Sequence, residues 1–341
     1  MNFLETLLWP LSLPFGAAVR LRARAYESGV FQQRRLDAVV ISVGNLTVGG
    51  TGKTPMVLWI AERLIAREEK TGILTRGYRG QASDGFTTSD EAQLLRARLG
   101  PRAAIGVGRD RWIRGRELSA RGIRWFILDD GFQHLQLVRD VDLVLIDATS
   151  PFGGGHLLPA GRLREPKSAL ARADIIVITR SGHAPAVEAV IRRTSVAPIF
   201  YARMRLESMH DWSGTYPGLE DSHARARRFF LFCGIGNPSA FLVDLRSAGF
   251  DIVGHRFFPD HHRYDERDLR SIEAAAQKAG ADRLLCTEKD VFNLGGNKGS
   301  SIPICYCRGS LEIERADEFW QTILAKAASS QLPRGNRESP S

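Results

Sequence analysis

The feature of this sequence that points most directly to chemistry is a glycine-rich turn, Gly49-Gly50-Thr51-Gly52-Lys53-Thr54-Pro55, which follows an apolar run at residues 38–44. Glycines let consecutive backbone N–H groups point at phosphate oxygens. The Lys53 ammonium would reach the β- and γ-phosphates of a nucleotide, and the Thr54 hydroxyl would bind Mg²⁺. The usual pattern has glycine six residues before the lysine, where this chain has Thr47. The turn predicts a nucleotide-binding phosphate loop.

A second apolar run, at residues 125–130, ends in Asp129 and Asp130. An apolar strand that carries a carboxylate to Mg²⁺ beside the phosphate loop is the usual companion of such a turn. An ordinary acidic turn at a strand end would contain the same residues. Because the chain also carries the Gly-Lys-Thr turn, we interpret the two aspartates as Mg²⁺ ligands beside the phosphate loop.

Three further polar segments are less specific. Ser89-Asp90-Glu91 is typical of a helix N-cap. Residues 260–264, DHHRY, would supply metal ligands, acid–base groups or plain surface, and zinc is disfavoured because no nearby cysteines complete a tetrahedral set. Thr287-Glu288-Lys289-Asp290 would line a cleft or cap a helix, and its place after an expected strand favours the cleft.

Apolar strand patterns alternate with helical ones, which predicts an α/β protein with a mainly parallel sheet covered on both faces. The expected strands of a first unit are 38–44, 71–76, 124–130, 141–148 and 173–180, with a helix at 55–68. A polar stretch at 205–225 marks an expected boundary. The second unit has expected strands at 228–236, 250–258, 282–288 and 301–307, and helices at 238–248 and 265–280.

The chain has 341 residues, which is long for one core, and a net charge of +9. The charge favours anionic partners, namely nucleic acid, phosphorylated substrates or an anionic membrane. No basic and aromatic interleaving of a nucleic-acid module is present, so we expect no nucleic-acid partner. The four cysteines, Cys233, Cys286, Cys305 and Cys307, are interpreted as reduced packing residues of a cytosolic protein.

The N-terminal segment combines an apolar stretch at residues 3–19 with five arginines between Arg20 and Arg35. No apolar run reaches the roughly 20 residues of a spanning helix. Apolar residues followed by arginines suit an interfacial membrane segment, and the alternative is a helix packed on its own domain. Pro10 and Pro14 are expected to interrupt any long helix here.

Together these segments resemble the tetraacyldisaccharide 4′-kinase family, the lipid A 4′-kinases of Gram-negative bacteria. The similar stretches follow the family order over most of the chain: Val43-Gly44-Asn45 leading into GGTGKTP, Thr75-Arg76-Gly77-Tyr78, Asp90-Glu91, the DDGFQH run at 129–134, LLPAG at 157–161, LREP at 163–166, FPDHH at 258–262 with Tyr264, and TEKD at 287–290. Two departures are Ser89, where the family usually has glycine, and Thr75, where serine is common.

The resemblance implies two Rossmann-like α/β domains, the first of P-loop NTPase type, with the active site in the cleft between them. It implies transfer of the ATP γ-phosphate to the 4′-hydroxyl of tetraacyldisaccharide 1-phosphate to form lipid IVA. The implied catalytic residues are Asp90, His261, Lys53 and Asp130; the nucleotide ligands are Gly49, Gly50, Thr51, Gly52, Lys53 and Thr54; the Mg²⁺ ligands are Thr54, Glu91, Asp129 and Asp130; and the substrate residues are His134, Arg164 and Glu165.

The implied organisation is a membrane-facing helical segment at 1–36, a kinase domain at 37–208, a second α/β domain at 209–328 and a disordered tail at 329–341. The implied partner is a glycolipid held in the bilayer, so we expect a monomer at the cytoplasmic face of the inner membrane. The alternative function is a P-loop regulatory or assembly ATPase that has no glycolipid substrate.

Overall fold

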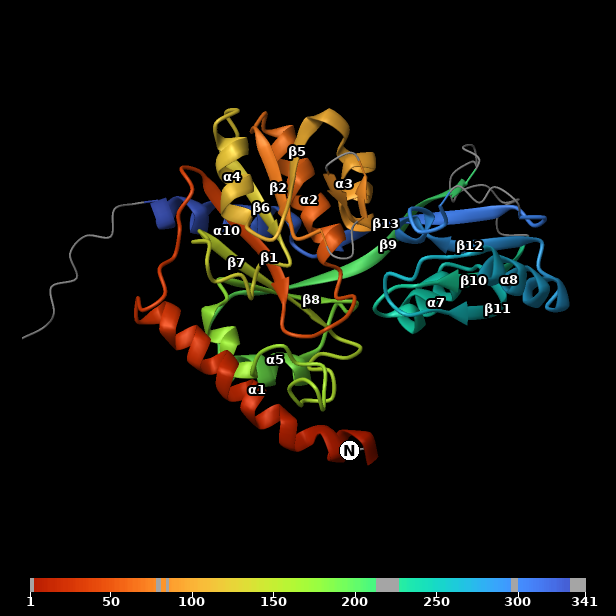
Figure 1. Cartoon of the computed structure of the whole chain (residues 1–341), viewed down its shortest axis with the longest axis horizontal. Helices are drawn as coiled ribbons and strands as arrows, with labels where there is room; N and C mark the ends of the chain where they lie inside the picture. Colours follow the sequence, from red (N-terminus) through yellow and green to blue (C-terminus); the bar gives the residue numbers. More distant parts are fainter. Residues whose placement is uncertain (1–2, 78–80, 84–85, 213–226, 296–299, 332–341) are drawn as a thin grey trace, which may run out of the picture.

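The computed structural model describes residues 3–77, 81–83, 86–212, 227–295 and 300–331. Its centre is one eleven-stranded sheet in the order β11-β10-β12-β13-β9-β8-β7-β1-β6-β2-β5. Figure 1 shows the sheet passing through the whole molecule, with a larger helical half around β1 and a smaller half around β10. The α/β class with a mainly parallel sheet is therefore confirmed.

The larger half holds the parallel strands of the sheet around β1, which leads into the phosphate loop. They are β1 (Val39–Asn45), β2 (Thr71–Thr75), β5 (Ala103–Val107), β6 (Trp125–Asp129), β7 (Val141–Asp147), β8 (Ile175–Thr179) and β9 (Ile199–Asp211). Every residue of β1, β2, β7 and β8 is buried, as expected for strands with both faces covered. The side chains of these strands alternate between two cores.

Helices form one layer on each face of these strands. One face packs on α2 (Lys53–Ala66), α3 (Asp90–Leu99) and α10 (Ala316–Gln331), whose Phe319 and Trp320 are buried. The opposite face packs on α4 (Arg111–Ser119), α5 (Pro185–Arg192) and the loops that contain the short helix η2 (Lys167–Arg172). Residues of η1 (Gly100–Arg102) lead into β5, and β3 (Gln81–Ser83) and β4 (Phe86–Thr88) form a small separate hairpin.

The smaller half is a second parallel unit. Its strands are β10 (Arg228–Cys233), β11 (Asp251–Phe257), β12 (Arg283–Thr287) and β13 (Ile304–Ile313). Helix α7 (Pro238–Ser247) packs on one face and α8 (Glu266–Lys278) on the other, while the short α9 (Glu288–Val291) follows β12. All four cysteines are buried in this half and are free thiols.

The two halves meet at an antiparallel pair of long strands. Strand β9 pairs with β13 from Ala202 opposite Ile313 to Asp211 opposite Cys305, with one register shift beside Arg308. The polar stretch expected at 205–225 is part of a strand up to Asp211, where its backbone pairs with β13, and residues 213–226 lie outside the described part. The expected division at 208/209 falls inside β9, so the independence of the two halves as domains stays a prediction.

The strands and helices expected from sequence are present, although β13 ends six residues after the expected strand at 301–307. The N-cap of α3 at Ser89 was also expected, whereas β3, β4, β5, β9, α4, α5 and α10 were not predicted. Helix α10 runs to Gln331, so the expected disordered tail was wrong for residues 329–331. The rest of that tail, residues 332–341, lies outside the described part of the chain, as does Tyr78.

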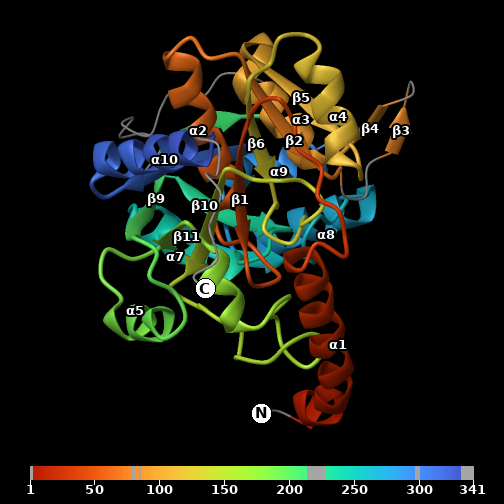
Figure 2. The same cartoon turned by 90° about the vertical axis from the view of Figure 1, so that its left-hand side faces the viewer.

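Helix α1 (Phe3–Glu27) is continuous through Pro10 and Pro14, so the expected interruption was wrong. Between the two prolines, Ser12 binds the helix to the body of the protein. Its hydroxyl donates to the Leu157 carbonyl at 2.9 Å and accepts from the Ala160 N–H at 3.2 Å. Figure 2 shows α1 standing out below the body with the N-terminus at its far end. None of the described helices is both long and apolar enough to cross a membrane.

Candidate active site

The phosphate loop connects β1 to α2 at the carboxyl edge of the sheet. Gly52 adopts φ 90°, a left-handed conformation that suits glycine, and α2 begins at Lys53. Asn45 orients the loop, since its amide donates to the Thr51 hydroxyl at 3.0 Å and its oxygen accepts from Lys53 Nζ at 3.4 Å. The loop is therefore preorganised by the last residue of β1.

The absence of glycine at Thr47 has a structural reason. Thr47 forms a bridge to Leu163 in an adjacent loop. The Val48 N–H donates to the Arg162 carbonyl at 2.8 Å, and the Arg164 N–H donates to the Leu46 carbonyl at 2.7 Å. This part of the turn is extended backbone, which does not need glycine.

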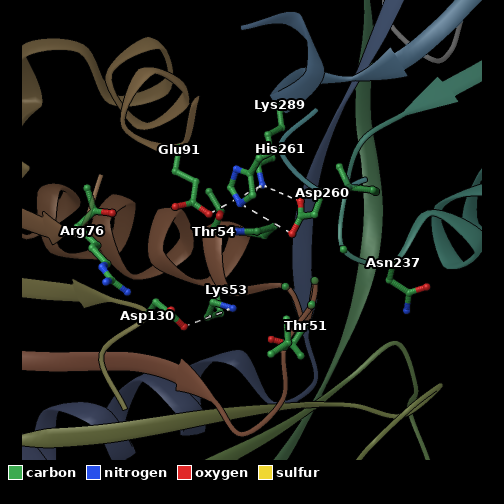
Figure 3. A pocket seen from close by; sticks show the side chains of 18 of the residues that line it. Thr51, Lys53, Thr54, Arg76, Glu91, Asp130, Asn237, Asp260, His261 and Lys289 are labelled. Atoms are coloured by element: carbon green, nitrogen blue, oxygen red, sulfur yellow. Dashed lines mark hydrogen bonds and ion pairs between the residues drawn. The ribbon is translucent and has the colours of Figure 1, made fainter. Parts of the chain in front are cut away.

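Asp130 lies beside the phosphate loop on a tight turn after β6, where its φ is 51°. Arg164 Nη1 contacts both of its carboxylate oxygens, at 2.7 and 2.8 Å, and Lys53 Nζ lies 3.5 Å away. Burial raises the Asp130 pKa, but these two cations outweigh burial and lower it to about 2. Asp130 is therefore an ionised carboxylate that already pairs with Lys53 (Figure 3).

Asp129, the preceding residue, is buried, and nearby positive charge offsets the cost of burying its carboxylate less well. Its contact is the Thr75 hydroxyl, which donates to Oδ2 at 3.3 Å. Burial and the neighbouring carboxylates Glu91 and Asp130 raise its pKa to about 7. At Asp129, burial and the neighbouring carboxylates thus outweigh the stabilisation that Lys53 and Thr75 give to the ionised form.

Asp90 and His261 meet across the two halves of the molecule. Asp90 begins α3, which Ser89 caps by accepting from the Ala92 N–H, and Asn293 donates to Asp90 Oδ2 at 3.2 Å. His261 Nδ1 lies 2.9 and 3.1 Å from the two Asp90 oxygens. Burial raises the pKa of Asp90, but the His261 contact and nearby Lys289 lower it overall. For His261 burial lowers the pKa, and the bond to Asp90 raises it overall.

Lys289, on α9, completes this group from the second half. Its Nζ lies 3.3 Å from both Asp260 Oδ1 and His261 Nε2, 3.8 Å from Asp90 and 3.9 Å from Glu91. Burial lowers the Lys289 pKa, but these carboxylates raise it overall, so it is an ammonium. In Figure 3, Glu91, His261, Asp260 and Lys289 gather across the cavity from Lys53 and Asp130.

The three expected substrate residues differ in their placement. Arg164 and His134 line the cavity. His134 Nδ1 lies 3.3 Å from Arg111, and burial together with Arg111 and Arg139 lowers its pKa to about 4, so the ring is neutral. Glu165 is buried behind the cavity wall, where it accepts from Gln133 at 3.0 Å and Arg172 at 2.8 Å.

One cavity of about 1160 Å³ joins these groups. Its wall includes the phosphate loop, Glu91, Asp130 and His261, whereas Asp90, Asp129 and Glu165 lie behind it. An apolar part contains Met204, Leu206, Ile235, Phe241 and Cys307 from both halves. A third part reaches Phe15, Val19 and Arg22 of α1. The cavity therefore connects the nucleotide loop to the N-terminal helix.

Sequence reasoning missed several residues of this site. Lys289 lay in a segment for which a cleft and a cap were both open, and both descriptions hold: Thr287 caps α9 with Asp290, while Lys289 enters the cavity. Arg111 and Asn293 carried no recognisable signal. Their roles follow only from α4 and the segment after α9 lying near the end of β6 and the start of α3.

A parallel sheet with a Gly-Lys-Thr turn between β1 and α2, and aspartates at the end of the neighbouring β6, defines a P-loop nucleotide-dependent enzyme. The paired Asp90 and His261, placed across the same cavity, are groups suited to phosphoryl transfer to a hydroxyl.

Comparison with known proteins gives the particular family. The family model of tetraacyldisaccharide-1-P 4′-kinases matches residues 4–328. A tetraacyldisaccharide 4′-kinase from Geobacter metallireducens is 42% identical over 310 residues, 85% of this chain and 88% of that protein. One from Anaeromyxobacter sp. (strain Fw109-5) is 36% identical over 351 residues, 97% of this chain and 93% of that protein.

A crystal structure of LpxK from Aquifex aeolicus in complex with ATP aligns with a TM-score of 0.71 at 26% identity, over 95% of this chain and 99% of that one. The chain belongs to the tetraacyldisaccharide 4′-kinase family and is an ATP-dependent kinase of lipid A biosynthesis. The resemblance seen in the sequence is confirmed, and the alternative of a regulatory or assembly ATPase is set aside.

Proposed function

We propose that this kinase transfers the γ-phosphate of ATP to the 4′-hydroxyl of tetraacyldisaccharide 1-phosphate, with Asp90 as the group that accepts the hydroxyl proton. The observation that carries the proposal is the contact at 2.9 Å between Asp90, directly behind the cavity wall, and His261, which lines the cavity together with Lys53. A sugar hydroxyl is a poor nucleophile, so a carboxylate placed to take its proton lowers the barrier. His261 comes from the second half and orients this carboxylate.

The nucleotide phosphates would bind the loop formed by Gly49, Gly50, Thr51, Gly52, Lys53 and Thr54. Lys53 is already positioned by Asn45 and Asp130, so it needs little rearrangement to meet a phosphate. The polyphosphate would then extend toward Asp130 and Arg164, whose guanidinium matches phosphate oxygens as well as it matches a carboxylate. In this arrangement Arg164 and His134 are the substrate contacts, and Glu165 positions Gln133 beside them.

The donor set also fits Mg²⁺. The ion commonly takes one or two carboxylates and completes its shell with phosphate oxygens and water. Across the described ranges, no group of three or more His, Cys, Asp or Glu side chains converges to hold a metal without such help. Glu91, Asp129, Asp130 and the Thr54 hydroxyl would hold it, and a cation there would favour the ionised form of Asp129, whose pKa is raised by burial and by its carboxylate neighbours. When bound, the ion would neutralise charge that develops on the transferred phosphate.

Helix α1 suits the delivery of a lipid-anchored substrate. Its large apolar residues Leu7, Leu11, Leu13 and Leu21 are more than half exposed, and Trp9 is 45% exposed. Its Arg20, Arg22 and Arg24 follow the apolar stretch and would meet lipid phosphates. Phe15, Val19 and Arg22 of the same helix line the cavity. We therefore infer peripheral attachment of a monomer at the cytoplasmic face of the inner membrane.

The catalytic proposal is tested by product formation. The full chain is incubated with ATP, Mg²⁺ and tetraacyldisaccharide 1-phosphate, and mass spectrometry detects a glycolipid heavier by one phosphate. Removal of the general base by Asp90→Asn should lower turnover by about 10²- to 10⁴-fold while ATP still binds. Asp265→Asn, a helix cap on α8 away from the cavity, is the matched control. Full turnover by Asp90→Asn would exclude Asp90 as the base.

The membrane proposal is tested by flotation with anionic vesicles. Because the exposed leucines are the expected contacts, Leu7→Ser combined with Leu11→Ser should reduce the vesicle-bound fraction without changing ATP binding. Val196→Ser, which replaces a fully exposed apolar residue before β9, is the control. Equal vesicle binding by all three proteins would contradict a role of α1 in attachment.

A further inference from the structure

Lys289 is a half-buried charged residue on the cavity wall to which the proposed mechanism gives no role. Its ammonium lies between the carboxylates of Asp90, Glu91 and Asp260 and contacts His261 Nε2 at 3.3 Å. It approaches the ring on the side opposite Asp90, which contacts Nδ1. The three residues form a continuous chain from Lys289 through His261 to Asp90.

This geometry distinguishes the protonation forms of the His261 ring. An ammonium has only donors, so the nitrogen that faces it must accept. A carboxylate has only acceptors, so the nitrogen that faces Asp90 must donate. With the proton on Nδ1 both contacts are hydrogen bonds, whereas with the proton on Nε2 both are repulsive. Asp260 Oδ2 lies 3.8 Å from Nε2, which is too far for a hydrogen bond that would stabilise the Nε2–H form.

The protein holds Lys289 on a rigid support. The Thr287 hydroxyl and Asp290 form a reciprocal cap of α9, and Asp290 also accepts from the Gly234 N–H and the Tyr264 hydroxyl, each at 2.8 Å. The preceding Glu288 is paired with Arg308 at 2.8 Å and with Arg98 of α3 at 3.4 Å. Since α3 also carries Asp90, this ion-pair network fixes α9 relative to the carboxylate.

We propose that Lys289 is a positioning residue, which fixes His261 as the Nδ1–H tautomer and so directs the imidazole N–H at Asp90. The inference rests on the proposed role of the Asp90 and His261 pair. In this proposal the Thr287–Asp290 segment supplies the group that orients the His261 ring toward Asp90 when the two halves are together. Lys289 acts mainly through His261, its nearer neighbour at 3.3 Å, while its direct distance to Asp90 is 3.8 Å, so most of its effect on turnover depends on His261.

A double-mutant cycle tests this dependence. Lys289→Met in the otherwise normal chain should lower kcat about tenfold, the effect expected for losing one charge-assisted hydrogen bond of about 1.4 kcal/mol. The KM for ATP should stay within about twofold. In a His261→Ala background the same change should cost clearly less, about threefold or below, because only the direct 3.8 Å contact with Asp90 remains. Lys289→Arg, which keeps a charged donor, should restore most of kcat, and Lys278→Met at the exposed end of α8 is the control.

Equal losses from Lys289→Met in both backgrounds would overturn the inference, since Lys289 would then act independently of His261. Lys289→Gln provides a second uncharged variant if the methionine variant does not fold. Imidazole ¹⁵N chemical shifts give a readout besides activity: His261 should carry a proton on Nδ1 and none on Nε2 in the normal chain. In Lys289→Met a fraction should be protonated at both nitrogens, because Asp90 still holds the Nδ1 proton while no ammonium opposes one on Nε2. A His261→Ala enzyme with normal kcat would instead refute the proposed catalytic pair, so the two failures are distinguishable.

Discussion

A single added methyl group at Gly236 should separate the phosphate loop from the second half of the molecule. Gly236 follows β10 and packs directly on the turn at Gly49 and Gly50. A Cβ there would lie 2.2 Å from the Gly50 nitrogen and 2.8 Å from the Gly49 carbonyl carbon. Both neighbours are backbone atoms of the nucleotide loop, so no side-chain rotation relieves the clash.

The magnitude follows from this geometry. Restoring an ordinary 3.4 Å contact from 2.2 Å needs a separation of about 1.2 Å. Overpacking of this kind costs about 1–3 kcal/mol. If the closed arrangement is the one that binds ATP, the dissociation constant for ATP in Gly236→Ala should rise by about 5-fold to 150-fold. The cores of the two halves lie elsewhere, so the unfolding temperature should change little.

Isothermal titration with a non-hydrolysable ATP analogue measures this change. The matched control is Gly309→Ala on β13, which lines the same cavity but whose Cβ would meet only the mobile end of Met204 at 3.2 Å and a backbone oxygen at 3.5 Å. Its affinity should stay within about twofold of the normal chain. Unchanged affinity in Gly236→Ala would show that ATP does not bind with these loops in contact.

Two further predictions address neighbouring groups. Asp244→Ala removes a carboxylate that lies 2.6 Å from Arg180 across the two halves. Like Gly236→Ala it should lower ATP affinity, by about 3- to 30-fold for a partly buried ion pair, in the same titration. Unchanged affinity would show that this ion pair does not hold the halves together. His134 has a pKa lowered to about 4, against about 6.5 unfolded, so the unfolded chain binds one more proton between these values and the stability from neutral His134 is lost as pH falls from about 6.5 to 4. Denaturant unfolding of the normal chain and His134→Gln should therefore show their stability difference shrinking by up to about 3 kcal/mol between pH 7.5 and pH 4, and a difference independent of pH would contradict a neutral buried ring.

The sequence by itself determined the features that are local along the chain. The phosphate loop is seven consecutive residues between a strand and a helix, and glycine, lysine and threonine act there through their immediate backbone geometry. The strands around it are continuous apolar runs, because both faces of a parallel sheet are buried. Asp129 and Asp130 could be placed near the loop for the same reason, since the carboxyl ends of parallel strands share one edge.

Other features depended on contacts between distant segments, which periodicity does not report. The two halves are connected by the pairing of β9 with β13. In the sequence, the alternating exposed residues of β9 resemble a loop until the partner strand is known. Helix α1 is continuous through two prolines, and Ser12 between them bonds residues 157 and 160, which no local pattern indicates. The pairing of Asp90 with His261 was suggested only by family resemblance, because the two residues are 171 positions apart in the sequence.

The chemistry of the site was therefore only half specified by local pattern. Lys289 looked like part of a helix cap, and it is that cap which turns its ammonium toward His261. The protonation of Asp129, Asp130 and His134 is set by burial and by charges from other strands and loops. Residue type and order fix what a side chain is able to do, whereas its charge state and partner depend on which distant elements the packed sheet brings within a few ångströms.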